Sequence, residues 1–342
     1  MLQKFFGPLT LAVVATSIPA LAEHQTPGSL LVFPCFDNTR SASTLFTVTN
    51  TNDDATLGSN GLANGTIDVE FVYINGDNCL ETNRTRRLTP NDTLTVVASV
   101  DNPNAVRGYV YVFAKRNGAA VSFNHLTGAS LTFSGQDNRD FELAPISFQA
   151  VSNVAGTPTD VDADGLRDLN GTEYVKVPDK LIIPRFLGQP EPNAFLGLNL
   201  DEARSQLVLI NLTGARFTTV VDFLVYNDNE EVFSAQYTID CWDRVWLTDI
   251  NAVFSDDFLE DFTNHNPNEI DAGSISSDVA EQGWFRMDGL VANSTAASVE
   301  NPAILAALIE SIEGDGGAQL PWGLGEQGNG DLLNRSILAD GN

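Results

Sequence analysis

Residues 160–168 have the residue types and the spacing of a cation-binding loop. Acidic side chains recur at Asp160, Asp162, Asp164 and Asp168, and Gly165 stands in the middle of the stretch. A tightly turning loop directs alternate side chains toward one centre, where a hard cation takes roughly six to eight oxygen ligands. The stretch therefore predicts a structural Ca²⁺ site with carboxylate ligands.

The same stretch resembles the beginning of an EF-hand calcium loop and is similar to the loops of dockerins and thrombospondin type-3 repeats. The backbone oxygen of Leu166 would add a ligand to the four Asp side chains. The pattern departs where the EF-hand has its bidentate glutamate, because Gly171 stands there and Glu173 follows two residues later. Whether Glu173 completes the site is left open. No whole-chain family is recognised.

Catalytic motifs do not assemble elsewhere in the sequence. The three histidines are His24, His125 and His265, none at metal-ligand spacing from another, and no H-E-x-x-H, G-x-S-x-G or phosphate-binding loop occurs. Acidic pairs such as Asp256-Asp257 and Glu260-Asp261 are typical of a solvated surface in a chain with 45 acids. We therefore predict a protein that is not an enzyme.

The charge balance excludes one class of partner. The formal net charge is −27, from 18 Lys+Arg against 45 Asp+Glu. Nucleic acid and anionic lipid bind through basic surfaces, which this chain does not offer. An excess of acid with few lysines also favours a protein that works in salty water, where screening weakens self-repulsion.

Residues 1–22 have the features of a secretory signal. Lys4 supplies the positive charge, Leu9 to Ile18 forms a short apolar stretch, and Ala20-Leu21-Ala22 is a cleavage pattern. No later stretch is long and apolar enough to span a bilayer, so no membrane insertion is expected. The prediction is a secreted protein, periplasmic or extracellular.

The chain has three cysteines, Cys35, Cys79 and Cys241, all after the predicted signal, and they could oxidise outside the cytoplasm. One disulfide and one free thiol are expected from an odd number. All three pairings stay open, with some preference for Cys35–Cys79 because both lie in the first predicted domain.

The elements that would position the loop are predominantly strands. Residues 66–74 alternate apolar and acidic side chains, and further strand signals recur between turn signals over residues 28–127. This pattern predicts an immunoglobulin-like antiparallel β-sandwich. Tyr109, Tyr111 and Phe113 share one face of a strand whose other face is also apolar, so we expect that strand to be covered on both sides.

Residues 205–325 repeat the theme and predict a second sandwich. The sequence IDVEFVYINGD (67–77) can be laid over VVDFLVYNDNE (220–230), which suggests an internal duplication. Residues 128–204 are rich in Asp, Pro and Gly and are predicted to form a connection that carries the calcium loop. Residues 326–342 are expected to be a flexible tail.

One helix is predicted near the C-terminus. Asn301 would be its N-cap, Pro302 its first residue and Gly314 its end. Between these residues, apolar side chains recur at helical spacing from Ile304 to Ile312.

Together these observations predict an exported structural or adhesion-type protein of the cell envelope or extracellular matrix. Its partner would be a surface or matrix protein or polysaccharide, with self-assembly through edge strands as a variant. Two other classes stay open. A carbohydrate-binding module would stack sugars on Trp242 and Trp246, and a secreted hydrolase would use a pair of acids.

Overall fold

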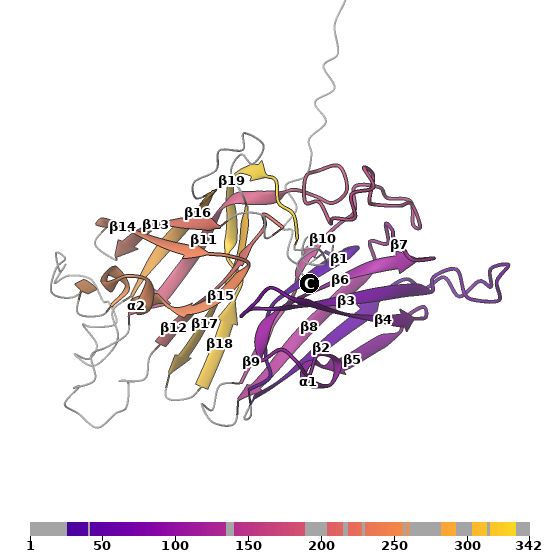
Figure 1. The fold of residues 1–342 in the computed structure, drawn as a ribbon, viewed down its shortest axis with the longest axis horizontal. Coiled ribbons are helices and arrows are strands. Elements are labelled where there is room, and N and C mark those ends of the chain that lie inside the picture. Colours follow the sequence, from indigo (N-terminus) through magenta and orange to yellow (C-terminus); the bar gives the residue numbers. More distant parts are fainter. Residues whose placement is uncertain are drawn as a thin grey trace, which may run out of the picture.

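The computed structural model describes residues 26–39, 42–134, 140–188, 204–214, 218–227, 230–255, 258–259, 282–291, 303–312 and 315–332. These residues form four antiparallel sheets and only short helical turns (Figure 1). Among the described helices, none has the length and apolar character needed to cross a membrane. The predicted mainly-β fold is confirmed, while the immunoglobulin-like subtype stays a prediction.

The first sandwich is made of two sheets, which we call 1a and 1b. Sheet 1a has the order β10-β1-β6-β3-β4, with β7 beside β6, and sheet 1b has the order β5-β2-β8-β9. The bounds are β1 Leu30–Asp37, β2 Ala42–Asn50, β3 Ile67–Asn75, β4 Glu81–Leu88, β5 Thr93–Val97, α1 Ala98–Asp101, β6 Arg107–Arg116, β7 Ala119–Ala120, β8 Leu126–Ser134, β9 Phe141–Leu143 and β10 Ile146–Phe148.

The second sandwich has sheets 2a and 2b. Sheet 2a has the order β14-β13-β16-β11-β19, and sheet 2b has the order β15-β12-β17-β18. The bounds are β11 Val177–Leu187, β12 Arg204–Asn211, β13 Thr219–Asn227, β14 Val232–Ile239, β15 Trp242–Trp246, α2 Leu247–Ile250, the 3-10 helix η3 Ala252–Phe254, β16 Gln282–Val291, β17 Ile304–Ile312, β18 Asp315–Gln319 and β19 Trp322–Gly328.

The two sandwiches have the same strand order. Sheet 2a, written from its other edge, reads β19-β11-β16-β13-β14 and corresponds strand by strand to sheet 1a. The ladder between β1 and β6 shifts register between Phe33 and Phe36, and the ladder between β11 and β16 shifts between Ile183 and Phe186. These ladders also pair Phe36 with Gly108 and Phe186 with Gly283. The correspondence therefore extends to single residues.

This residue-level correspondence differs by one position from the one suggested by the sequence. Asn75 lies opposite Gly108, and Asn227 lies opposite Gly283, so Asn75 corresponds to Asn227. The sequence comparison had placed Asp228 there. A shift of one residue exchanges the two faces of a strand, so only the structural register aligns the buried side chains Phe71 and Phe223.

Three apolar layers hold the four sheets in a stack. One lies inside the first sandwich and includes Phe46, Phe71 and Val110. A second lies inside the second sandwich and includes Phe223 and Phe285. The third, which we call the inter-sandwich layer, is formed by the outer faces of sheets 1a and 2b. Its main members are Leu30, Val32, Val72, Ile74, Tyr109, Tyr111 and Phe113 from sheet 1a and Val208, Ile210, Trp242, Leu305, Ala307 and Ile309 from sheet 2b.

Strand β6 confirms the prediction of a strand that is covered on both faces. Val110 and Val112 point into the first sandwich, whereas Tyr109, Tyr111 and Phe113 point into the inter-sandwich layer. All five are at least nine-tenths buried. The apolar character of both faces therefore reflects a sheet that packs on another sheet at each side.

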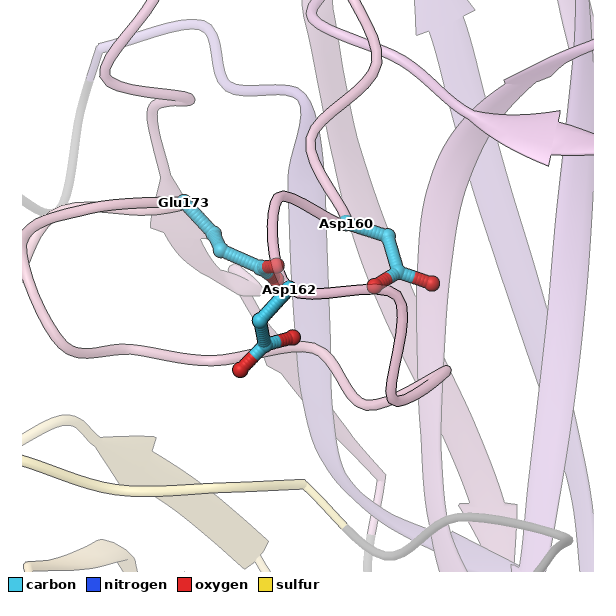
Figure 2. A group of neighbouring side chains, drawn as sticks. All are labelled: Asp160, Asp162 and Glu173. Atoms are coloured by element: carbon cyan, nitrogen blue, oxygen red, sulfur yellow. The ribbon is translucent and has the colours of Figure 1, made fainter.

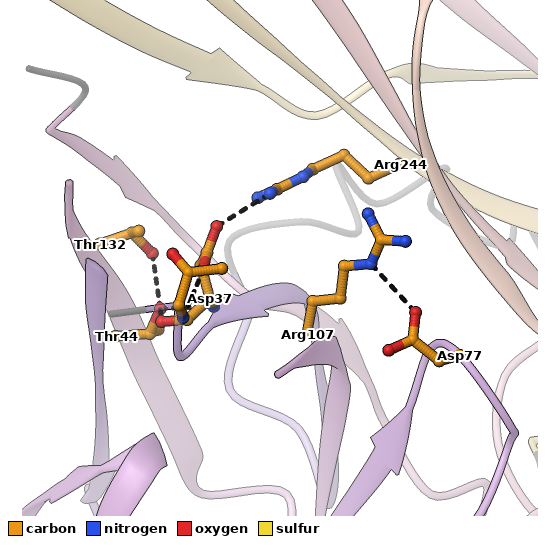
Figure 3. Close-up of polar contacts among 7 residues, drawn as sticks. Asp37, Thr44, Asp77, Arg107, Thr132 and Arg244 are labelled. Atoms are coloured by element: carbon orange, nitrogen blue, oxygen red, sulfur yellow. Dashed lines mark hydrogen bonds and ion pairs between the residues drawn. The ribbon is translucent and has the colours of Figure 1, made fainter. Parts of the chain in front are cut away.

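Polar and covalent bonds reinforce the inter-sandwich layer. Cys79 and Cys241 form a disulfide across a sequence separation of 162 residues. The Trp242 Nε1 donates to the carbonyl oxygen of Pro34 at 2.9 Å. Arg244 of β15 donates to Asp37 of β1 at 2.8 Å, as Figure 3 shows. Burial alone would raise the pKa of Asp37, but Arg244 and the N–H of Thr39 outweigh it and lower that pKa.

The preference for a Cys35–Cys79 disulfide was wrong. Cys35 is a free, buried thiol within the inter-sandwich layer, and its burial raises its pKa to about 11. The partner of Cys79 lies in the other sandwich, because the layer brings the loop after β3 to the start of β15. Proximity of two cysteines within one predicted domain therefore did not predict which of them form the disulfide.

The helix predicted over 301–312 was also wrong. Residues Ile304–Ile312 form strand β17, which lies between β12 and β18. Its side chains alternate between two buried surroundings: Leu305, Ala307 and Ile309 enter the inter-sandwich layer, while Ile304 and Leu308 enter the second sandwich. A strand buried on both faces is a continuous apolar run, which helical spacing also fits. The predicted caps Asn301, Pro302 and Gly314 lie outside the described residues.

The boundaries of the predicted connection differ as well. Strands β8, β9 and β10 extend the first sandwich to Phe148, and β11 begins the second sandwich at Val177. The connection between the sheets is therefore 149–176 and not 128–204. Part of the predicted tail, as far as Gly328, belongs to β19, which pairs with β11. The predicted signal at 1–22 and residues 333–342 lie outside the described residues.

The disulfide yields a testable prediction. Replacing both Cys79 and Cys241 by Ser is expected to lower the free energy of unfolding by on the order of 2–5 kcal/mol, because the bond closes a long loop in the unfolded chain. Chemical denaturation of the oxidised proteins measures this loss. Cys35→Ala, which removes a thiol but no bond, is the matched control. Equal stability of the double variant and the unaltered chain would contradict the prediction.

Candidate metal centre

The connection over 149–176 is attached to both sandwiches. An isolated bridge joins Pro158 to Val121 of the first sandwich, and a second bridge, between Ala150 and Tyr174, closes the connection on itself. A further bridge joins Asp168 to Asp331, and the Leu169 N–H donates to the carbonyl oxygen of Gly330 at 2.7 Å, in the segment that follows β19. The predicted calcium loop is therefore held in place at both ends.

The acidic side chains fold the loop by accepting bonds from its own backbone. Asp160 Oδ2 accepts from the N–H of Gly165 at 3.2 Å, and Asp164 Oδ1 accepts from that of Leu166 at 2.7 Å. Gly165 has a φ of +82°, a left-handed conformation that glycine adopts without strain. The alternation of Asp residues thus produces the tight turn on which the prediction depended.

Five carboxylates gather in this turn. Oxygen atoms of Asp160, Asp162 and Glu173 lie within 4.8 Å of one another, and so do those of Asp162, Asp164 and Asp168. Asp162 belongs to both groups and links them. Figure 2 shows the Glu173 side chain reaching from its own stretch of the connection toward the stretch that carries Asp160 and Asp162. The residue that the sequence left open therefore belongs to the cluster.

Glu173 organises the loop from within. Its side chain is 2% exposed, its Oε1 accepts from the N–H of Val161 at 2.7 Å, and its Oε2 accepts from that of Asp168 at 3.2 Å. Burial is the main influence on the pKa of Glu173 and raises it, although these two N–H groups oppose the change. A buried carboxylate that carries both bonds fixes the two ends of the loop relative to one another.

Two carboxylate oxygens of the loop are buried without a hydrogen-bond partner. They are Oδ1 of Asp160 and Oδ1 of Asp168. Asp168 is 8% exposed, and its other oxygen accepts from the amide of Asn170 at 3.1 Å. An unsatisfied buried acceptor is costly, so a positive ligand at these oxygens would remove the cost.

The pKa of Asp168 reflects its burial and the repulsion between the clustered carboxylates. Its pKa is raised to about 7. Burial is the main cause, and repulsion from the neighbouring carboxylates Asp331, Glu173, Asp164 and Asp162 adds to it. Asp331 is separated from the loop by more than 150 residues of sequence (160–168 against 331) and approaches it only through the bridge with Asp168. No local sequence signal identifies it, so sequence reasoning missed it.

The predicted backbone ligand has a different partner. The carbonyl oxygen of Leu166 accepts from the guanidinium of Arg167, which also donates to the oxygen of Gly165 at 3.2 Å. The same guanidinium lies 4.7 Å from the ring centroid of Phe113. Arg167 thus balances part of the acidic charge, and it would release the Leu166 oxygen for a cation to use it.

The remaining candidate residues do not form the predicted sites. Trp242 is 5% exposed and bonded to Pro34, so it offers no sugar platform together with Trp246. His125 packs edge-on against Phe123. The acidic pairs at 256–257 and 260–261 lie outside the described residues, as do His24 and His265.

A separate groove of about 720 Å³ lies on sheet 2a, away from the acidic loop. It includes Asp222 and Asp288, which oppose each other across β13 and β16. Gln236 donates to Asp222 at 2.6 Å, and Lys180 lies 3.8 Å from Asp288. Both acids are therefore already engaged by neighbouring side chains, and the groove belongs to the outer face of this sheet.

Comparisons with known proteins add little to this geometry. No family model and no curated protein matches the chain. A solved structure from cowpea mosaic virus, titled "Cowpea mosaic virus top component (CPMV-T) - naturally occurring empty particles", matches at 8% identity over 93% of this chain and 98% of that chain. Its TM-score is 0.19, which supports no argument about fold or function.

The raised pKa of Asp168 yields a second prediction. Because its pKa is higher in the folded chain than in the unfolded one, the folded state takes up the proton first, and stability falls as pH rises from about 4 to about 7. Asp168→Asn is therefore expected to raise the melting temperature of the cation-free protein at about pH 8, with the gain shrinking toward about pH 4.

Thermal melts in a chelator across this pH range test the effect. Asp53→Asn, at an exposed loop residue outside the cluster, is the matched control and should leave the profile unchanged. A gain that is the same at both ends of the pH range would show that charge at Asp168 is not its cause.

Proposed function

We propose that this chain is an exported, non-enzymatic structural protein whose connection binds Ca²⁺ and is stiffened by it. The observation that carries the proposal is the cluster of five carboxylates with two buried, unpartnered oxygens. Carboxylate oxygens in a flexible loop suit Ca²⁺ better than smaller or softer cations. Asp160, Asp162, Asp164, Asp168 and Glu173 are the proposed side-chain ligands, with the Leu166 oxygen after release from Arg167.

The position of the cluster explains what bound calcium would do. The loop touches the first sandwich through Arg167 and Phe113 and the second through Leu169 and Gly330. A divalent cation would cancel the mutual repulsion of the carboxylates and would hold the loop in the conformation that makes these contacts. Binding to the folded state alone adds to stability by mass action.

Two sequence features support export. The N-terminal segment with Lys4 and Ala20-Leu21-Ala22 has the pattern of a secretory signal. The disulfide between Cys79 and Cys241 suits an oxidising compartment outside the cytoplasm. We place the protein in the cell envelope or extracellular space, where millimolar Ca²⁺ matches the affinities of extracellular calcium modules, on the order of 10⁻⁴ to 10⁻³ M.

The matching strand orders support the further proposal that the two sandwiches arose by duplication of one ancestral unit. The shared register shift at Phe33/Phe36 and Ile183/Phe186 is the detail that supports it best, because unrelated sandwiches need not bulge at the same strand and neighbour. An adhesive role toward a surface polymer is consistent with this architecture.

Calorimetry and thermal melts test the calcium site. Ca²⁺ is expected to raise the melting temperature of the full chain and to bind with a dissociation constant on the order of 10⁻⁴ to 10⁻³ M. Asp162→Asn combined with Asp160→Asn keeps the side-chain size but removes two ligand charges, so binding should weaken at least tenfold.

Asp53→Asn combined with Asp77→Asn removes two exposed charges elsewhere and is the matched control. Mg²⁺ at equal concentration distinguishes a calcium site from general screening, since Mg²⁺ dehydrates reluctantly and prefers a rigid octahedral shell. The proposal fails if Ca²⁺ produces no heat and no stabilisation, or if the ligand double variant responds like the control.

A further inference from the structure

Each sandwich has two outer faces, and the chain uses only one of each pair internally. The outer face of sheet 1a packs on the outer face of sheet 2b to form the inter-sandwich layer. In the part of the chain that the structure describes, the outer faces of sheet 2a and sheet 1b lie at the two ends of the stack (Figure 1). They correspond in strand order to the two faces that are packed together.

These two end faces also carry exposed apolar side chains. On sheet 2a the outward-pointing Val232, Leu290, Trp322 and Leu324 are 53%, 40%, 67% and 41% exposed. On sheet 1b the outward-pointing Phe133 is 41% exposed. These side chains lie on β14, β16 and β19 of sheet 2a and on β8 of sheet 1b, so each end face offers apolar side chains to a partner.

The outer face of sheet 2a is a more polar version of the buried face of sheet 1a. Comparing the strand registers of the two sandwiches assigns each buried residue of sheet 1a an equivalent residue on sheet 2a. Some counterparts are also large and apolar: Ile74 corresponds to Tyr226, Val72 to Leu224 and Tyr109 to Trp284. Others are charged: Tyr111 corresponds to Arg286, Phe113 to Asp288 and Leu30 to Lys180.

The outer face of sheet 1b is likewise a more polar version of the buried face of sheet 2b. At three positions sheet 1b has a threonine where sheet 2b has a buried apolar residue: Thr47 for Val208, Thr49 for Ile210 and Thr127 for Leu305. Ala129 and Leu131 correspond to Ala307 and Ile309 and keep their apolar character. Threonine matches the shape of Val208 but is smaller than Ile210 and Leu305, so the face is shallower at two positions. It also presents hydroxyl groups, of which those of Thr47 and Thr49 pair with Thr95 and Thr93 at 3.0 Å.

We propose that the outer face of sheet 2a binds the outer face of sheet 1b in a second copy of this chain. The arrangement repeats the internal packing of sheet 1a on sheet 2b, with Arg286, Asp288 and Lys180 facing threonine hydroxyls in place of apolar contacts. Because the two faces differ, the contact is heterologous, and copies add head to tail without closing. The inference names a partner for the structural role proposed above and rests on that role, but it does not depend on calcium.

The contact between copies is weaker than the one within the chain. Cys79, in the turn between β3 and β4, has Glu230 as its counterpart in the turn between β13 and β14, and both residues have a positive φ, 60° and 64°. Cys241, directly before β15, has Asp92 as its counterpart before β5. Two acids thus stand where the internal interface has its disulfide. Their repulsion makes association reversible, and salt strengthens it by screening.

Two variants block the faces separately. Trp322→Arg with Leu324→Arg places charge on the exposed end of sheet 2a, and Thr47→Arg with Thr49→Arg does so on sheet 1b. Leu57→Arg with Leu62→Arg, at exposed loop residues, is the matched control. Light scattering and sedimentation of the full chain at rising protein and NaCl concentration measure the mass, and circular dichroism checks that each variant is folded.

The unaltered chain and the control are expected to increase in mass with protein and salt concentration. Each blocked variant alone should remain a monomer. Their equimolar mixture should form dimers and stop there, because each variant supplies the one face that the other has lost. The proposal is overturned if the unaltered chain stays monomeric up to about millimolar concentration, or if either blocked variant still dimerises with itself, which would indicate an isologous contact.

Calcium titration of the same samples separates the two proposals. A monomeric chain that binds Ca²⁺ with normal affinity overturns the head-to-tail contact and leaves the calcium site. Assembly that proceeds equally in a chelator, without any Ca²⁺ binding, supports the contact and removes the calcium site. Blocked variants that lose Ca²⁺ binding would count against the proposal, because neither face includes the acidic loop.

Discussion

The inter-sandwich layer is the contact on which the rest of the structure depends. It converts two sandwiches, which alone would be separate domains on a linker, into a single stack with an apolar layer between sheets 1a and 2b. The disulfide between Cys79 and Cys241 and the ion pair between Asp37 and Arg244 close this layer at its edge. The connection over 149–176 then runs between two fixed points, which allows an acidic loop to keep a defined shape.

The acidic loop illustrates how this support is used. Carboxylates in solution would move apart, yet five of them are gathered around Asp162. The loop is held by Glu173, whose two oxygens accept backbone bonds, and by the bridge of Asp168 to Asp331. The free energy that opposes this gathering is visible in the raised pKa of Asp168. The gathered charges are unfavourable alone, and the proposed Ca²⁺ would offset their repulsion.

The sequence allowed the mainly-β fold class and the turn of the acidic loop to be predicted, because both depend on neighbouring residues, while Ca²⁺ binding at the loop stays a prediction. Alternation along residues 66–74 identified β3, and the spacing of Asp160, Asp162 and Asp164 identified the loop. What depends on the layer was not predictable. The apolar residues of β17 also fit helical spacing, because both faces of this strand are buried. The disulfide partner of Cys79 lies in the other sandwich. Asp331 approaches the loop only after β19 has paired with β11.

The same layer also shows why the two end faces differ from it. A face that is always covered within the chain can be wholly apolar, as Val208, Ile210 and Leu305 are, since it never meets water after folding. A face that is exposed before a partner arrives must remain soluble, and the smaller, hydroxyl-bearing threonines at the corresponding positions of sheet 1b lower the cost of exposure. The net charge of −27 acts in the same direction, because it keeps copies apart until salt or a cation screens it. One sheet geometry can therefore support a permanent contact and a reversible one, with the polarity and size of the facing side chains setting the difference.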